Sequence, residues 1–165
     1  MESQSGAVRA EPFDVRTFGE FCDIIEIGGL TGHEINEGMC LRYSNLARLD
    51  FDAVGRPGIS LFRARLRTLP VRLNLMERHP LGSQAFIPMD GSSFLVAVSA
   101  DDCGKPGPPR ATVIKPGQAV NILRNTWHAV LTPLSGSGLF AVVDWIGQEP
   151  NLVEHHFETP YVIEA

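Results

Sequence analysis

Residues 77–88 read Glu-Arg-His-Pro-Leu-Gly-Ser-Gln-Ala-Phe-Ile-Pro, and they continue a strand-like run in which apolar and polar residues alternate. The apolar members of that run are Val71, Leu73 and Leu75. Glu77 and His79 continue the same alternate register, so the pattern predicts that both side chains point toward the core. Ionisable groups are costly in a core unless they are paired, hydrogen-bonded or bound to a metal. The segment therefore predicts a functional site within a β-sheet fold.

Short β-like runs separated by Gly and Pro extend in both directions from this segment, with little helical periodicity. The predicted strands are Cys22–Ile27, Met39–Tyr43, Gly58–Arg67, Pro70–His79, Ser83–Met89, Phe94–Ala100, Ala111–Ile114, Ala119–Leu123, Trp127–Leu131, Leu139–Trp145 and Val153–Phe157. So many short strands predict an all-β sandwich or barrel. A short helix is expected after Pro12, where Phe13, Phe18 and Phe21 would seal one end of the core. The segment Asp101–Pro109 has the composition of a surface loop.

Length and charge narrow the class of protein. The chain has 165 residues, of which 44% are hydrophobic, and this suits one well-filled core. We therefore expect residues 1–165 to form a single catalytic domain, with residues 1–10 frayed. The net charge is −5 and there is no basic block, so the sequence gives no indication of nucleic-acid binding.

Cysteine usage and hydropathy indicate a cytoplasmic protein without a membrane anchor. The three cysteines are scattered, form no C-x-x-C pair and are an unsuitable framework for disulfides. The N-terminus lacks the apolar segment of a signal peptide, and no apolar run approaches the roughly 18 residues of a membrane span.

The conspicuous segment has the spacing of a cupin metal-binding motif. The first cupin motif has the form G-x5-H-x-H-x3,4-E-x6-G, and Glu77-x-His79-x4-Gln84-x6-Gly91 has its spacing from the first His onward. Glu replaces the first His, and Gln replaces the motif's Glu. Glu for His retains a possible metal ligand, whereas Gln for Glu weakens one.

A second motif lies about forty residues further along. The second cupin motif has the form G-x5-P-x-G-x2-H-x3-N, and counting from Gly117 places Leu123 at the Pro position, Asn125 at the Gly position and His128 at the His position. These spacings predict a cupin-type double-stranded β-helix, or jelly roll, with a short N-terminal helix.

At full length the chain resembles the ureidoglycolate lyase family, formerly called ureidoglycolate hydrolase. The resemblance runs from about residue 13 to residue 160. It is carried by residues 77–88 and by four further segments: Phe18–Ile25, Phe62-Arg63-Ala64, Leu69-Pro70 and Arg124–His128.

The resemblance implies a homodimeric enzyme that splits (S)-ureidoglycolate into glyoxylate and urea, in the allantoin branch of purine degradation. One carbon of this substrate bears a hydroxyl, a carboxylate and a urea nitrogen. Its cleavage needs a base for the hydroxyl proton, an acid for the departing nitrogen, and a group that stabilises the developing alkoxide charge.

Matching positions assign the central roles to three residues. Glu77, His79 and His128 are the predicted catalytic residues, and the same three are the predicted ligands of a divalent metal. Nickel or manganese is favoured over structural zinc because the set contains no thiolate. A site that uses Glu77 or His79 directly as the base is the alternative. The ordinary interpretations are a core histidine at position 128 and a buried Glu77–arginine ion pair.

Five further residues are predicted to contact the substrate: Arg63, Gln84, Asn121, Arg124 and Asp144. Arg63 and Arg124 are candidates for binding the carboxylate through a bidentate guanidinium. Gln84 shares a register with Phe86 and so faces inward, where it either contacts urea or ties strands together. Asp144 lies inside an apolar run, and it either orients a catalytic histidine or pins the last strands.

Two other functions remain open at this point. The first is an amidohydrolase in which the same site attacks the urea carbonyl and releases ammonia and carbon dioxide. A non-catalytic cupin that binds a small acid is the second possibility, although carboxylate binding alone needs no inward-facing Glu.

Overall fold

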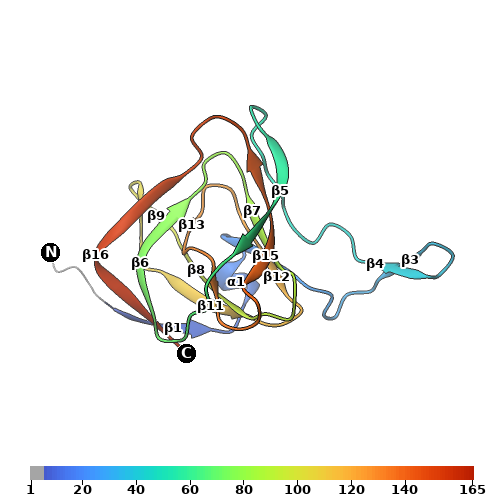
Figure 1. Ribbon diagram of the computed structural model, residues 1–165, viewed down its shortest axis with the longest axis horizontal. Coiled ribbons are helices and arrows are strands. Elements are labelled where there is room, and N and C mark those ends of the chain that lie inside the picture. The colour runs from blue at the N-terminus through green and yellow to red at the C-terminus, as the bar shows by residue number, and fades with distance from the viewer. Residues whose placement is uncertain (1–5) are drawn as a thin grey trace.

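The computed structural model describes residues 6–165, and nearly all of its regular structure is β-strand (Figure 1). The elements are β1 (Ala7–Glu11), α1 (Val15–Phe18), β2 (Cys22–Ile25), β3 (His33–Ile35), β4 (Cys40–Arg42), β5 (Arg56–Arg63), β6 (Val71–Arg78), β7 (Gln84–Pro88), β8 (Phe94–Ser99), β9 (Asp101–Asp102), β10 (Lys105–Pro106), β11 (Arg110–Ile114), β12 (Ala119–Ile122), β13 (Trp127–His128), β14 (Thr132–Pro133), β15 (Leu139–Ile146) and β16 (Val153–Glu164). The prediction of an all-β, cupin-type fold with a short N-terminal helix is confirmed.

Two sheets form the body of the molecule. Seven of the described strands form the first sheet, in the order β11-β1-β16-β6-β13-β8-β14. Because β11 also pairs with β8, this sheet closes into a ring. The second sheet has five strands, in the order β2-β12-β7-β15-β5.

Each layer has its own apolar core. The first core fills the closed ring and contains Trp127, Met76 and Leu95, which come from three of its strands. The second core lies between the ring and the five-stranded sheet, where Phe94 of β8 meets Phe140 of β15 edge to face at 5.1 Å between ring centroids. Alternate residues of β8 serve the two cores, which is why all six of its residues are buried.

The alternation that the sequence predicts for β6 is broken in the structure. Val71 and Leu73 pack with Met76 in the ring core. The side chains that face this core therefore change from odd-numbered to even-numbered positions between residues 73 and 76. At this point the pairing of β6 with β16 shifts register, between His156 and Tyr161. The prediction that Glu77 shares a face with Val71 and Leu73 is therefore wrong, because a bulge re-aims the strand. Glu77 faces the other layer.

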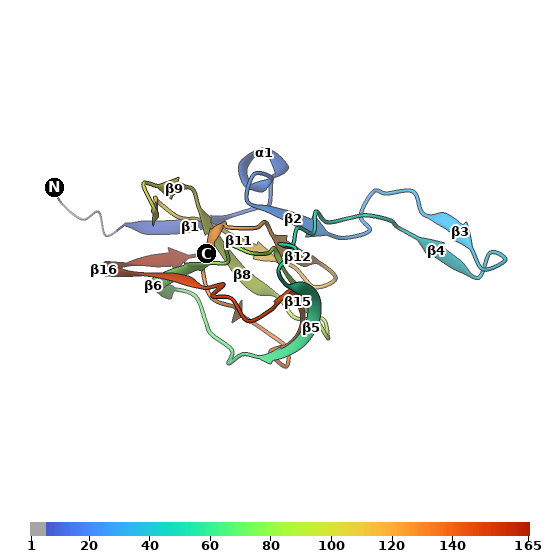
Figure 2. The ribbon, with the colours of Figure 1, turned by 90° about the horizontal axis from the view of Figure 1, so that it is seen from above.

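The helix lies where the sequence places it. Asp14 caps α1 by accepting a hydrogen bond from the backbone N–H of Arg16 at 2.9 Å. Phe18 and Phe21 are buried in the second core, and Phe13 stacks on Phe18, so the aromatic seal is confirmed. The helix covers one side of the strands (Figure 2). Within residues 6–165 no helix is long and apolar enough to cross a membrane.

The N-terminal segment departs from the prediction that residues 1–10 are frayed. Residues 7–11 form β1, which pairs in parallel with both β11 and β16. The neighbouring strands satisfy the backbone hydrogen bonds of this segment, and its sequence alone does not reveal such long-range pairing. Residues 1–5 lie outside the described part of the chain.

Two connections also differ from the predictions. The segment Asp101–Pro109 contains the small hairpin β9–β10, whose turn uses φ of +52° at Cys103 and +84° at Gly104. The chain between β2 and β5 forms a second hairpin, β3–β4, of which the sequence predicts only one strand. This hairpin stands away from both sheets (Figures 1 and 2).

The aromatic layer between the sheets makes a stability prediction. Phe140→Ala is expected to cost about 3–5 kcal/mol of unfolding free energy, because it removes a fully buried ring and leaves a cavity. Val54→Ala in the exposed turn before β5 is the control and is expected to change stability by less than about 0.5 kcal/mol. Urea denaturation measures both values, and equal losses would contradict the assignment of Phe140 to the core.

Candidate active site

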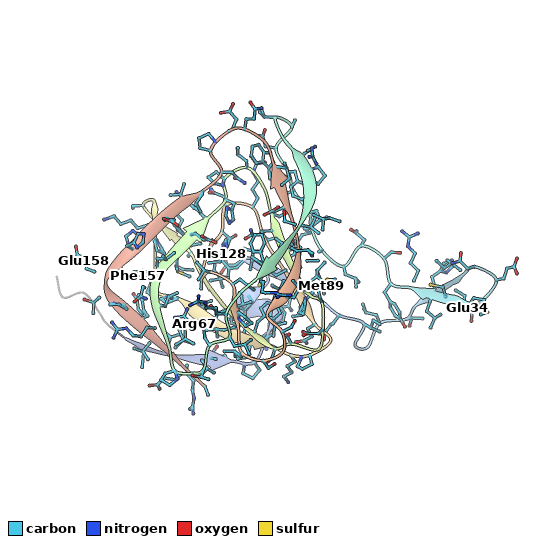
Figure 3. All side chains as sticks on the ribbon, viewed as in Figure 1. Glu34, Arg67, Met89, His128, Phe157 and Glu158 are labelled. Carbon is cyan, nitrogen blue, oxygen red and sulfur yellow. The ribbon has the colours of Figure 1, made fainter. Side chains whose placement is uncertain are left out.

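Glu77, His79 and His128 come together between the two sheets. Glu77 on β6 lies directly opposite His128 on β13 in an antiparallel pair, and His79 follows β6 by one residue. The Glu77 carboxylate is at ion-pair distance from both imidazoles, with Oε1 3.7 Å from Nε2 of His79 and 3.6 Å from Nε2 of His128. His128 is almost fully buried and lies in the interior of the molecule (Figure 3).

Backbone carbonyls set the orientation of both imidazole rings. Nδ1 of His79 lies 2.8 Å from the carbonyl oxygen of Asn151, and Nδ1 of His128 lies 2.9 Å from that of Thr126. A carbonyl oxygen only accepts hydrogen bonds, so each Nδ1 carries a proton. In the neutral rings each Nε2 therefore presents a lone pair. Both Nε2 atoms are buried without a hydrogen-bond partner among the described residues.

The electrostatics of the group favour an ionised carboxylate at Glu77. Burial by itself would raise the pKa of Glu77, but the adjacent imidazoles of His128 and His79 outweigh it and lower the pKa to about 2. Burial would lower the pKa of His79, yet the Glu77 carboxylate and the Asn151 carbonyl raise it overall. The carboxylate thus keeps its charge throughout the neutral range.

The second sheet contributes a polar pair to the same interior. Nε2 of Gln84 on β7 donates to Oδ2 of Asp144 on β15 at 3.2 Å. Burial raises the pKa of Asp144, while Gln84 and then the charge of His79 oppose that rise. Oε1 of Gln84 and Oδ1 of Asp144 remain buried without a partner in the described structure. The pair therefore offers two free acceptor atoms to a ligand that carries N–H or O–H groups.

Asn125 explains how the second motif works without its glycine. Its φ is +61°, in the left-handed region that glycine adopts most easily and that Asn tolerates better than most residues. The backbone N–H of Asn125 donates to the carbonyl of His79 at 3.0 Å. This turn joins the two motifs and sets the start of β13, so that His128 meets Glu77.

Arg63 and Asn121 are not part of this group. Arg63 is exposed at the end of β5, in register with the outward residues Ile59 and Leu61. Asn121 alternates with core residues and lies on the outer face, where its amide donates to Asp23 at 3.2 Å and to the Arg48 carbonyl at 3.0 Å. Strand register separates both side chains from the interior between the sheets.

Arg124 lies beside the site and is held by other groups. Its Nε donates to the carbonyl of Pro80 at 2.7 Å, and its guanidinium forms ion pairs with Asp50 and Asp52. These contacts tie the loop after His79 to the segment that precedes β5. The position next to the motif is as the sequence predicts, and the guanidinium already has two carboxylate partners.

Comparison with known proteins identifies the family. A model of the family described as ureidoglycolate lyase matches residues 5–164. The chain belongs to the ureidoglycolate lyase family. The family resemblance predicted from the sequence is therefore confirmed.

Relatives of this ureidoglycolate lyase family member match it over nearly their whole length. "Ureidoglycolate lyase" of Rhodobacter capsulatus is 53% identical over 155 residues, which cover 94% of this chain and 96% of the relative. "Ureidoglycolate lyase 2" of Rhizobium meliloti is 45% identical, covering 93% and 94% of the two chains. "Ureidoglycolate lyase" of a Chelativorans species is 46% identical with the same two coverages.

Asn151 is a site-supporting residue of this family member that sequence reasoning does not find. Its backbone carbonyl receives the Nδ1–H of His79, and its side-chain Oδ1 accepts the N–H of Leu81 at 2.7 Å. Any residue supplies a backbone carbonyl, so the first contact has no sequence signature. The loop between β15 and β16 thereby orients a histidine that lies far away in sequence.

The donor set of the ureidoglycolate lyase site can hold a metal ion. One ligand atom from each of Glu77, His79 and His128 lies within 4.8 Å of the other two. Two Nε2 lone pairs and one carboxylate on the same side of a buried space suit a divalent ion with open coordination positions. The outer nitrogen of each ring is already hydrogen-bonded, as is usual for metal-binding histidines.

The raised pKa of Asp144 predicts how stability depends on pH. Below the unfolded pKa near 3.8 the carboxyl is protonated in both states, so burial carries no charge penalty. As pH rises, the carboxyl ionises first in the unfolded state, whereas burial resists ionisation in the folded state. The free energy of unfolding therefore falls until pH has passed through the folded pKa. Asp144→Asn is therefore expected to stabilise the protein at neutral pH and to give no gain near pH 3. Thermal melting with a chelator present measures this difference.

The matched control is Asp102→Asn on β9, because Asp102 is exposed and its substitution is expected to change stability by less than about 0.5 kcal/mol. An Asp144→Asn difference that is equal at both pH values would contradict a buried, destabilised carboxylate at position 144.

Proposed function

We propose that this protein is a lyase that cleaves (S)-ureidoglycolate into glyoxylate and urea, within the allantoin branch of purine degradation. One observation carries the proposal: two imidazole Nε2 atoms and a carboxylate from one sheet face two free acceptors from the other sheet. The first set suits the hydroxyl and carboxylate end of the substrate, and the second suits its ureido end. The lyase names of the full-length relatives support the same reaction.

We assign the anionic end of the substrate to a metal held by Glu77, His79 and His128. When bound there, nickel or manganese would lower the pKa of the substrate hydroxyl and offset the charge of the substrate carboxylate. The nearby arginines support this assignment, because they already have other partners. Arg124 is paired with aspartates, and the Arg78 guanidinium binds Asp101 and covers the Trp127 ring.

The ureido end is assigned to Gln84 and Asp144. A ureido group carries N–H donors on both nitrogens, and the free Oε1 of Gln84 and Oδ1 of Asp144 accept hydrogen bonds. The Gln84–Asp144 hydrogen bond fixes the two acceptors relative to each other. The pair therefore orients the urea nitrogen for departure and explains why the motif's Glu is replaced by Gln.

Proton transfer is assigned to Asp144. Glu77, with its pKa of about 2, is a poor proton acceptor at neutral pH, whereas burial raises the pKa of Asp144 and strengthens it as a base. In the proposed step Asp144 removes the hydroxyl proton, the carbonyl of glyoxylate forms, and the C–N bond breaks. The same carboxyl then returns the proton to the departing nitrogen, so urea leaves neutral and Asp144 is regenerated.

The setting of the enzyme completes the proposal. Residues 1–165 act as one cupin-like catalytic domain in the cytoplasm, and the active form is a homodimer that takes a small-molecule substrate. Neither nucleic acid nor membrane is a partner. The net charge of −5 supports the first exclusion, and the scattered cysteines support an intracellular location.

Product identity tests the reaction. Purified enzyme is expected to release urea and glyoxylate in equal amounts, because cleavage at the carbinol carbon leaves the urea carbonyl intact. Enzymatic assays for urea, glyoxylate and ammonia on one sample measure the outcome. Ammonia without urea would replace the lyase with an amidohydrolase, and unchanged substrate would leave a small-acid-binding cupin.

Metal binding tests the three-residue site independently of turnover. His128→Ala is expected to weaken Mn²⁺ binding, measured by electron paramagnetic resonance, by more than the about 10–100-fold that losing an outer partner costs. Turnover is expected to fall by about 10²–10⁴-fold. The control is His156→Ala, because His156 is exposed and, among residues 6–165, forms an ion pair with its near neighbour Glu154 alone.

Unchanged Mn²⁺ affinity in His128→Ala would remove the metal from this position. Full activity of chelator-treated, metal-free wild type would leave direct acid-base catalysis by the same residues.

A further inference from the structure

The chain between β2 and β5 leaves the body of the molecule as a long arm. We define the hairpin arm as residues 26–47, which include β3 and β4. Among the described strands these two pair only with each other, and the arm projects away from both sheets, with Glu34 near its far end (Figures 2 and 3). A two-stranded hairpin without a neighbouring surface is marginally stable in water. The arm therefore needs a surface on which to pack.

The hairpin arm carries large apolar side chains that its own chain leaves uncovered. Met39 is 86% exposed, and three more apolar residues are at least half exposed: Ile27, Leu30 and Leu41. Single exposed apolar residues are ordinary, but a cluster on one projecting element indicates a contact surface.

A second uncovered apolar surface lies on the five-stranded sheet. We define the sheet patch as Ile59, Leu61, Ile87 and Met89, which are all exposed. Across the strands, Ala141 of β15 lies between Leu61 of β5 and Ile87 of β7, so the apolar row is continuous. The solvent face of an antiparallel sheet is normally polar.

The two surfaces meet at the base of the arm. Ile27 and Leu46 of the hairpin arm and Ile87 of the sheet patch line one open groove of about 280 Å³. A two-fold axis near this groove would bring each arm toward the sheet patch of the other copy. Such an interface is self-complementary, because each chain supplies both the arm and the surface that receives it.

Charged residues beside the hairpin arm and the sheet patch also suit a second copy of this chain. Glu34 and Glu37 are exposed on the hairpin, while Arg63 and Arg65 are exposed where the chain leaves β5, beside the sheet patch. Opposite charges at the rim of an apolar contact favour correct pairing. This arrangement gives Arg63 a role outside the catalytic interior.

We propose that two copies of this chain associate by laying the hairpin arm of each on the sheet patch of the other. The proposal rests on the homodimer named under the proposed function and specifies its interface. The proposed interface consists of two identical contacts, and each contact joins the hairpin arm of one copy to the sheet patch of the other. Loss of either surface is therefore expected to weaken both contacts.

Sedimentation velocity tests the interface with two double variants. Met39→Glu/Leu41→Glu alters the arm, and Ile59→Glu/Leu61→Glu alters the patch. Each is expected to weaken dimerisation at least about 100-fold, because charged groups would be buried at both contacts. The control Val15→Glu/Leu152→Glu changes equally exposed apolar residues elsewhere and is expected to remain dimeric. Replacing residues 33–42 with a Gly-Ser linker repeats the arm test without added charge.

Mixing the two double variants distinguishes arm-on-patch packing from other dimers. The arm variant keeps an intact patch and the patch variant keeps an intact arm, so the mixture regains one good contact and is expected to associate more tightly than either alone. Contacts of arm with arm, or of patch with patch, predict no such gain.

A monomeric wild type would overturn both the homodimer and its interface. A dimer that persists in both double variants, or a mixture without gain, would overturn the interface alone. Urea release is assayed in parallel, so a failed interface and a failed lyase assignment are distinguishable.

Discussion

The cross-strand pair between Glu77 of β6 and His128 of β13 is the constraint on which the site depends. β13 is two residues long, yet it lies between β6 and β8 and holds Trp127 in one core and His128 in the other. One backbone register thus sets both the packing of the ring and the meeting of the two motifs. His79 joins the pair through the Asn125 turn, which links the ends of both strands.

The ionised carboxylate and the raised histidine pKa are consequences of this burial. A carboxylate alone in an apolar interior would be destabilised, and two imidazoles at ion-pair distance reverse the effect at Glu77. Asp144 lacks comparable partners, so its pKa moves upward. Two acids in one interior therefore differ in proton affinity, which is the usual basis for dividing roles between structural charge and proton transfer.

Sequence reasoning predicts the fold class, the helix and the meeting of Glu77, His79 and His128, because motif spacing encodes short turns and strand lengths. It places Glu77 on the wrong face because the bulge opposite β6 arises from β16, about eighty residues away along the chain. Strand alternation tells which residues share a face, but it does not tell which face meets the other layer. The pairing of β1 and the outward direction of Arg63 on β5 are not visible in the sequence for this kind of reason, because both are set by long-range strand pairing.

The distance between the two groups of site residues is set by residues outside the site. The candidate metal ligands Glu77 and His128 belong to the ring, and Gln84 and Asp144 belong to the five-stranded sheet, so the distance between the two pairs depends on how the sheets pack. Phe86, Phe94 and Phe140 fill the space between the sheets. Because protein interiors are close-packed, substitutions in this aromatic layer would act on the relative position of the two pairs without changing any polar group of the site.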